Sequence, residues 1–216
     1  METQASGHLG SEDVRPFHCR VCGFVVALVA LIVFTPVMAV IAVIIKLDTP
    51  GPVLFFQRRI GLNGKPFWFV KFRTMYVDAR ERFPELYEYR YDEDELRSLH
   101  FKVKDDPRVT PQGRWLRRTT LDELPNFWNV LTGQMALVGP RPEIPEMMPY
   151  YEGRMLKKFS VRPGITGLAQ CSGRGDLDFL ETVEMDVRYV ETRSLALDLW
   201  ILWHTVVSVL LARGAF

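Results

Sequence analysis

Residues 24–45 read FVVALVALIVFTPVMAVIAVII, a run without a charged side chain. Because a helix rises about 1.5 Å per residue, about 20 apolar residues cross the roughly 30 Å hydrocarbon core of a bilayer. The run is longer than the apolar part of a typical cleaved signal peptide, and no small-residue cleavage site followed by a polar mature start is evident. It therefore predicts a membrane helix that stays in the protein.

The dipeptide Thr35-Pro36 lies near the middle of this run. Pro36 has no amide hydrogen, so the carbonyl of Ile32 is left unpaired where no water can satisfy it, and a kink is expected. Basic residues precede the run at positions 15 and 20 and follow it at positions 46, 58, 59 and 65, so the positive-inside rule does not assign the two ends to opposite faces. Two arrangements stay open on these grounds: a re-entrant helix that enters and leaves by one face, and an ordinary kinked spanning helix.

Composition limits the class of protein. The 216 residues suit one domain with membrane segments, and the formal charge of +1 gives no general polyanion-binding signal, so no nucleic-acid partner is expected. Cys19, Cys22 and Cys171 are too few for a disulfide framework and favour a reducing compartment. Cys19 and Cys22 have the spacing of half a zinc site, but no second CxxC or HxxxH accompanies them, so we expect small residues entering a membrane helix. Residues 1–14 are polar and are expected to be disordered.

Residues 194–212 form a second apolar run, which contains Asp198 and His204 and carries Trp200 and Trp203. Tryptophans in such a run are typical of the membrane interface, so we expect residues 194–216 to form a membrane-associated helix in the plane of the bilayer. Packing on the domain and crossing the bilayer stay open. His204 has no carboxylate partner at helical spacing and is expected on the polar side of the helix rather than as a catalytic base.

Two β-type runs follow the first membrane segment, at residues 53–60 and 66–73, and Gly61-Leu62-Asn63-Gly64 joins them. Asn-Gly supplies the positive-φ residues of a tight turn, so the pair predicts a β-hairpin. Its basic side chains suit either a ligand or anionic headgroups; they are Arg58, Arg59, Lys71 and Arg73. Residues 77–99 predict short exposed helices interrupted near Pro84, with the acids at 92–95 at a helix start.

Residues 119–143, TTLDELPNFWNVLTGQMALVGPRPE, place the adjacent carboxylates of Asp122 and Glu123 shortly after Arg117. Thr120-x-x-Glu123 has the spacing of a capping box, so we expect both acids at or just before a helix N-terminus. This position offers a purely structural role, because acids there complement the helix dipole.

Two arginines downstream favour a functional role for the acids. Arg141 lies between Pro140 and Pro142, and Arg162 precedes Pro163 in the stretch VRPGITG. Proline stiffens the backbone that carries each guanidinium group, and guanidinium binds phosphate through a bidentate fork. With an acid pair and a membrane anchor, these arginines indicate a site that handles a phosphorylated substrate at the bilayer surface.

The chain resembles the bacterial sugar transferase family, the monotopic polyprenyl-phosphate phosphoglycosyl transferases. Four stretches carry the resemblance: GPVLFFQRRIGLNGKPFWFVKFRTM, KDDPRVTPQGRWLRRTTLDELPNFWNVLTGQMALVGPRPE, VRPGITGLAQCSGR and YVETRSLALDLWILWHTVVSVLLARGAF. Together with the membrane run they cover nearly everything from residue 15 onward. The region before the acid pair and the RGAF end are most similar to members that transfer hexose-1-phosphate. The stretch PFHCRVCG departs from the basic residue and Phe-Asp-Leu usual in the family, which leaves the anchoring of the helix's N-terminal end in doubt.

The resemblance implies an α+β, mainly α, fold. Residues 15–47 would form a re-entrant membrane helix broken at Thr35 and Pro36, and residues 48–193 a compact cytosolic catalytic domain with a small β-hairpin. Residues 194–216 would form the C-terminal membrane-associated helix. The resemblance also implies the bacterial inner membrane, with the catalytic domain on its cytoplasmic face.

The resemblance further implies a reaction. Asp122 would be the nucleophile and, with Mg²⁺, would attack the β-phosphate of a nucleoside diphosphate sugar, so that a UDP-sugar releases UMP. Polyprenyl phosphate, such as undecaprenyl phosphate, would then take the phosphosugar from Asp122. Glu123 would assist metal binding or proton transfer. The phosphate- and nucleotide-contacting positions of the family match Arg141, Pro142 and Arg162 here, with Arg117, Lys71 and Arg73 as further members.

Two other classes of protein compete with this hypothesis. A conventional metal-dependent glycosyltransferase would use Asp176-Leu177-Asp178 as its metal site and release a nucleoside diphosphate, although no parallel-strand pattern precedes the triplet. A membrane-bound scaffold would use the acids and arginines as an internal salt-bridge network. The sequence leaves open the sugar, aminosugars included, the polyprenol length, the pathway and the oligomeric state, a homo-oligomer included.

Overall fold

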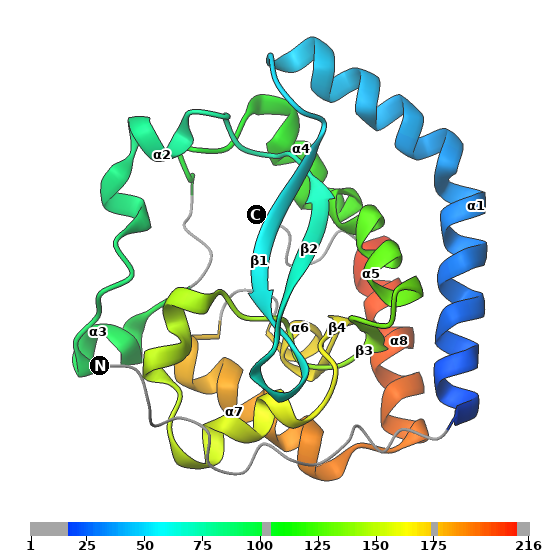
Figure 1. Ribbon diagram of the computed structural model, residues 1–216, viewed down its shortest axis with the longest axis vertical. Helices are drawn as coiled ribbons and strands as arrows, with labels where there is room; N and C mark the ends of the chain where they lie inside the picture. Colours follow the sequence, from blue (N-terminus) through cyan, green and yellow to red (C-terminus); the bar gives the residue numbers. More distant parts are fainter. Residues whose placement is uncertain (1–16, 101–104, 174–176, 211–216) are drawn as a thin grey trace.

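The computed structural model describes residues 17–100, 105–173 and 177–210. Helices predominate, and the strands form two small sheets of two strands each, β1-β2 and β3-β4. Figure 1 shows the β1-β2 hairpin near the centre of the view and the long helix α1 at its right edge. The expected mainly helical α+β fold with a small hairpin is confirmed.

Helix α1 spans Phe17–Asp48 and contains Pro36. The hydroxyl of Thr35 donates to the carbonyl of Leu31 at 2.6 Å, and α1 bends along its length (Figure 1). Most apolar side chains of α1 are exposed, and within the described ranges α1 is the one helix long and apolar enough to cross a membrane. On its inner side Ile41 and Ile45 pack against Phe72, Leu116 and Leu124, so the second half of α1 belongs to the hydrophobic core of the domain.

Strands β1, Leu54–Ile60, and β2, Pro66–Phe72, form the predicted antiparallel hairpin. The turn η1, Leu62–Gly64, has φ of 55° at Asn63 and 73° at Gly64, as the Asn-Gly signal predicts. Alternate residues of a strand point to opposite faces, so Arg59 and Lys71 share one face of the hairpin. Arg58 lies on the other face, 5.4 Å from the ring of Trp68. The basic residues of the hairpin therefore lie on both of its faces.

Strands β3, Ala136–Val138, and β4, Gly164–Thr166, pair in parallel. The amide of Gly139 donates to the carbonyl of Thr166 at 2.8 Å, and the amide of Gly164 donates to that of Pro140 at 2.9 Å. A Cβ atom on Gly164 would lie 2.1 Å from the nitrogen of Gly139, so only glycine permits this approach. The pairing brings the two proline-flanked arginine segments side by side.

Short helices carry most of the remaining chain. Before the acid pair they are α2, Ala79–Arg82, η2, Pro84–Tyr87, α3, Glu93–Ser98, and α4, Pro111–Thr119. The acid pair and its surroundings lie in η3, Leu121–Asn126, α5, Phe127–Leu131, η4, Pro145–Tyr150, and η5, Gly153–Ser160. The C-terminal part contains α6, Leu168–Ser172, α7, Phe179–Thr192, and α8, Leu195–Leu210. The predicted helix start at residues 92–95 is confirmed, since Asp92 and Glu95 form a capping box.

The capping box predicted at Thr120 and Glu123 is wrong. Thr120 ends α4 in the left-handed conformation, with φ of 61°, and its side chain makes no capping hydrogen bond. An N-cap residue needs an extended backbone, which Thr120 lacks because it first terminates the preceding helix. The amide of Glu123 donates instead to the backbone carbonyl of Thr120 at 3.2 Å.

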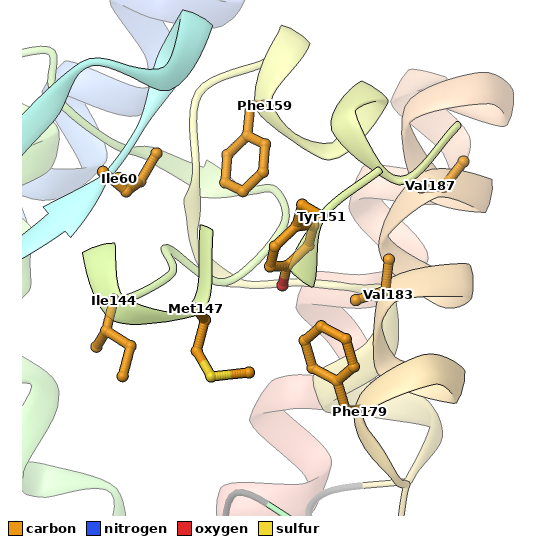
Figure 2. Close-up of a cluster of buried hydrophobic side chains, with 8 residues drawn as sticks. All are labelled: Ile60, Ile144, Met147, Tyr151, Phe159, Phe179, Val183 and Val187. Carbon is orange, nitrogen blue, oxygen red and sulfur yellow. The ribbon is translucent and has the colours of Figure 1, made fainter. Parts of the chain in front are cut away.

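The largest hydrophobic cluster joins the end of β1, η4, η5 and α7. Figure 2 shows its eight buried members: Ile60, Ile144, Met147, Tyr151, Phe159, Phe179, Val183 and Val187. The ring of Tyr151 makes edge contacts with Phe159 and Phe179, with centroid distances of 5.0 and 5.4 Å. This cluster fixes the segment after Arg141 against α7.

Helix α8 packs on the domain through Ile201, which lies in a cluster with Val138, Leu168 and Tyr189. Trp200 and Trp203 are exposed. His204 stacks on Trp200 at 3.8 Å between ring centroids, and its Nδ1 lies 2.9 Å from the Trp200 carbonyl. An in-plane position of α8 in the membrane stays a prediction.

Candidate active site

The acid pair lies where the hairpin, α4 and the long apolar helix α1 meet. Asp122 and Glu123 occupy the first turn of η3, which packs against β2. Leu124 anchors this turn to Ile41 and Ile45 of α1. The side chain of Asp122 is only 6% exposed. A carboxylate is thus buried beside a helix that is apolar enough to cross a membrane.

Burial and neighbouring charges act on Asp122 in opposite directions. Burial raises the pKa of its carboxyl from 3.8 to about 6, because a low-dielectric site disfavours the charged form. Lys71 lowers the pKa, Glu123 raises it, and Arg117 and Arg141 lower it. Asp122 therefore ionises near neutral pH, and its charge is compensated by Lys71 of β2, Arg117 of α4 and Arg141 of the segment after β3.

Lys71 is the cation with the largest effect on Asp122. Burial lowers the pKa of the Lys71 ammonium to about 8, the charge of Asp122 raises it, and the nearby Arg117, Arg59 and Arg141 lower it further. The hairpin holds this lysine on the face that it shares with Arg59. Lys71 is therefore still largely protonated at neutral pH, when Asp122 is ionised.

Glu123 has a different environment from its neighbour. Burial would raise its pKa, but the charge and hydrogen bond of Arg141 hold that pKa below its ordinary value. The Nη2 atom of Arg141 lies 2.7 Å from Oε1 of Glu123. Two adjacent carboxyls with opposite pKa shifts are suited to different chemical tasks.

Arg59 belongs to the same cluster; it is one of the basic hairpin residues noted in the sequence, but the family resemblance does not place it among the site residues. It donates from Nη1 to the carbonyl of Pro142 at 3.1 Å and from Nε to Gln57 at 3.0 Å. Burial, together with the charge of Arg141, lowers the pKa of Arg59 to about 10. The positive charges of Arg59 and Arg141 repel each other, so a bound anion would stabilise both guanidinium groups. The signal was the two-residue alternation of the hairpin, which places Arg59 on the face of Lys71.

Arg117 is held beside Asp122 by a chain of polar contacts. Its Nε donates to the hydroxyl of Thr74 at 3.0 Å, and its Nη1 lies 3.8 Å from the buried Asp106. Asp106 also accepts two hydrogen bonds of 2.8 Å from the guanidinium of Arg108. The charge of Arg117 still acts on Asp122, so α4 contributes one predicted residue to the site.

The other predicted site residues are Arg73, Arg162 and Pro142, and each makes a hydrogen bond with the protein itself. Arg73 is buried and donates to the carbonyls of Pro50 and Thr49 at 2.6 and 2.8 Å, so it fastens the loop after α1. Arg162 donates to the carbonyl of Gly133 at 2.8 Å. Pro142 is buried and accepts the hydrogen bond of Arg59. Their predicted roles in substrate binding stay predictions.

The described part of the chain contains no group of three or more His, Cys, Asp or Glu side chains arranged to hold a metal. Mg²⁺ usually takes one or two protein carboxylates and completes its shell with water and substrate phosphates. Asp122 and Glu123 provide such a minimal oxygen donor set. The residues present therefore fit a Mg²⁺ ion that takes its remaining ligands from water and from the diphosphate of the substrate.

Asp176-Leu177-Asp178 is the metal site of the alternative glycosyltransferase hypothesis, and one of its two acids has a structural role. Asp178 caps α7, accepting from the amide of Glu181 at 2.8 Å in a full capping box. Asp176 lies outside the described residues. One of the two carboxylates that a glycosyltransferase would need is thus engaged in helix capping.

Comparison with known proteins identifies the family. A family model described as bacterial sugar transferase matches residues 14–212. The chain is 38% identical to the exopolysaccharide production protein ExoY of Rhizobium meliloti (strain 1021), over all of this chain and 93% of that protein. It is 40% identical to the UDP-glucose:undecaprenyl-phosphate glucose-1-phosphate transferase of Escherichia coli (strain K12), over 89% of this chain and 40% of that protein. It is 43% identical to the galactosyl transferase CpsE of Streptococcus agalactiae serotype III (strain NEM316), over 76% of this chain and 36% of that protein. The chain thus spans nearly all of ExoY but less than half of the other two, and it belongs to the bacterial sugar transferase family.

Proposed function

We propose that the protein transfers a hexose 1-phosphate from a UDP-hexose to undecaprenyl phosphate, an early membrane step of bacterial polysaccharide assembly. The names of the relatives support the reaction type, since one is a UDP-glucose:undecaprenyl-phosphate glucose-1-phosphate transferase and another is a UDP-galactose-lipid carrier transferase. The observation that carries the proposal is the buried Asp122, with a pKa of about 6, among Lys71, Arg117 and Arg141. This is a nucleophile in a site built for phosphate.

The proposed mechanism has two displacements. The carboxylate of Asp122 attacks the β-phosphorus of the donor, and the bond from that phosphorus to the bridging oxygen breaks, so that UMP leaves. An oxygen of undecaprenyl phosphate then attacks the phosphosugar on Asp122, which releases the free carboxylate and undecaprenyl-diphosphate-sugar. A covalent carboxylate intermediate divides one difficult transfer into two easier ones.

The surrounding cations reduce the repulsion between a carboxylate and a diphosphate. Lys71 and Arg117 lie near enough to Asp122 to change its pKa, and Arg141 forms an ion pair with Glu123. Positive charge at the site stabilises the transferring phosphoryl group as well as the ionised nucleophile. When bound at the acid pair, Mg²⁺ would add charge neutralisation of the diphosphate.

We further propose that α1 is re-entrant in the bacterial inner membrane, with the catalytic domain on the cytoplasmic face. The bend in α1, visible in Figure 1, supports this arrangement. The packing of Ile41 and Ile45 on the catalytic core also supports it. Cysteines introduced by Glu12→Cys and Pro52→Cys, in a chain without its native cysteines, provide the test. A membrane-impermeant maleimide should label both from the cytoplasmic side, whereas labelling from opposite sides would establish a spanning helix.

The transfer reaction is tested with purified protein in nanodiscs, Mg²⁺ and a panel of UDP-sugars, with and without undecaprenyl phosphate. We expect UMP release and a sugar-phosphate adduct in the intact mass, both abolished by Asp122→Asn. The matched control Asp178→Asn changes the capping residue of α7 and should keep both signals. Release of UDP, or turnover that survives Asp122→Asn, would refute the mechanism and favour a conventional glycosyltransferase.

A further inference from the structure

A second cluster of buried charges lies next to the Arg141 segment, and the proposed mechanism does not use it. Lys158 in η5 is 3% exposed, and its ammonium lies 3.2 Å from Oε2 of Glu143 and 3.2 Å from Oδ2 of Asp186. Lys158 also donates to the hydroxyl of Tyr151 at 3.0 Å, and that hydroxyl donates to Glu143 at 2.7 Å. We call these four residues the Lys158 network.

Burial makes the network costly to maintain for stability alone. Taking one ammonium and two carboxylates out of water costs several kcal/mol per ion, and a well-packed apolar group of the same size is often as stable. The buried Oδ2 of Asp186 makes no hydrogen bond and has the ammonium of Lys158 as its ion-pair partner. The network therefore calls for a role beyond filling the core.

Glu143 connects the network to the candidate active site. It directly follows Pro142 and is two residues from Arg141. Its backbone carbonyl accepts from the amide of Ile60 at 2.7 Å, and the neighbouring Pro142 accepts from Arg59 at 3.1 Å. The side chain of Glu143 is fixed from η5, while its backbone is fixed to the end of β1.

Arg141 depends on this backbone for its position. Its side chain is 41% exposed, so packing of the side chain itself restrains it little. The contact with Glu123 joins only one end of the guanidinium group. A shift of about 1 Å in a positioning group can cost roughly a hundredfold in rate.

We propose that the Lys158 network is a positioning device that holds the Pro140–Glu143 segment, and with it Arg141 and Arg59, at the geometry that binds the donor diphosphate. The inference rests on the proposed transfer reaction and names the residues that tune its donor site. None of the four residues contacts the substrate; they act through Arg141.

The test uses Tyr151→Phe, which removes one hydroxyl and keeps the ring contacts with Phe159 and Phe179 (Figure 2). We expect the KM for the UDP-sugar and the Kd for UMP to rise about tenfold, with a smaller change in kcat. In an Arg141→Lys background the same substitution should change either value less than twofold, because the positioned group is already altered. Lys157→Met, at an exposed ion pair with Glu191, is the matched control and should change neither value.

Thermal unfolding establishes that each variant is folded before binding is measured. If Tyr151→Phe does not fold, Asp186→Asn replaces it in the same cycle, with the same expected loss of UMP affinity. Equal fold-changes in both Arg141 backgrounds, or unchanged values in a folded variant, would overturn the inference and leave the network a structural feature. If the unsubstituted protein bound no UMP, the proposed function and this inference would both fail. If it bound UMP and the variants gave either of the two results above, only this inference would fail.

Discussion

Replacing Asp122 by asparagine should abolish transfer and, at the same time, stabilise the folded protein above pH 6. The folded-state pKa of Asp122 is raised from 3.8 to about 6, mainly by burial. Between these two values the carboxyl is protonated in the folded chain and ionised in the unfolded chain. The free energy of unfolding therefore falls as the pH rises through this window, and the full cost of the buried charge is present above pH 6.

The size of the effect follows from the pKa shift. One pKa unit corresponds to about 1.4 kcal/mol, so the shift to about 6 costs roughly 3 kcal/mol once Asp122 is ionised. Asparagine has the same shape without the charge, but its amide must find new hydrogen bonds. We therefore expect a net gain of about 1 to 2 kcal/mol above pH 6, and a rise in Tm of a few degrees.

Glu123→Gln is the matched control because the sign is opposite. Arg141 holds the pKa of Glu123 below its ordinary value, so the ionised carboxylate stabilises the fold above its unfolded pKa and that contribution is lost as the pH falls. Thermal unfolding of both variants in nanodiscs at pH 8 and pH 4.5 makes the comparison. Asp122→Asn should gain stability and Glu123→Gln should lose it at pH 8, with both differences smaller at pH 4.5. A loss of stability in Asp122→Asn at pH 8 would refute the reasoning, because Asp122 would then be a partner in a stabilising salt-bridge network, as a scaffold requires.

Three further outcomes are expected. The kcat/KM for UMP release should fall about tenfold per pH unit below about pH 6, because Asp122 must be ionised to attack; a flat profile down to pH 5 would exclude it as the titrating nucleophile. Lys158→Met should lower the free energy of unfolding by about 3 to 5 kcal/mol in urea titrations, since Glu143 and Asp186 lose their buried counter-ion, whereas the exposed Lys157→Met should change it by less than about 1 kcal/mol. Chelation by EDTA should stop UMP release and added Mg²⁺ should restore it; turnover unaffected by EDTA would contradict a metal at the acid pair.

Local signals in the sequence predicted the elements that depend on neighbouring residues. The Asn63-Gly64 turn fixed the hairpin, because positive φ at both positions is a property of those two residues. The uncharged run at residues 24–45 predicted α1, since length and composition suffice for a membrane helix. The motif resemblance selected Asp122 and Glu123, which the structure places together with Lys71, Arg117 and Arg141.

The remaining features depend on contacts between distant parts of the chain. Strands β3 and β4 have three residues each, too few for a two-residue alternation to be recognised. Lys157 and Lys158 are adjacent and chemically identical, yet one is exposed and the other is buried between two carboxylates, which only the packing of η5 on α7 decides. The capping-box prediction failed for a related reason. Thr120 is the C-cap of α4 and has the left-handed conformation of that position, so it cannot also act as a side-chain N-cap of η3.

The acid pair lies beside the one described helix that is long and apolar enough to cross a membrane. Leu124 lies two residues from Asp122 and packs on Ile41 and Ile45 of α1, so the long apolar helix supports the turn that carries the buried carboxyl. Burial is also the largest cause of the raised pKa of Asp122. The turn that packs on α1 therefore also carries the residue that we propose to attack the donor. In the proposed reaction one soluble and one lipid-borne phosphate would meet at this junction, where a buried carboxylate lies among cations supplied by the hairpin, by α4 and by the segment of Arg141.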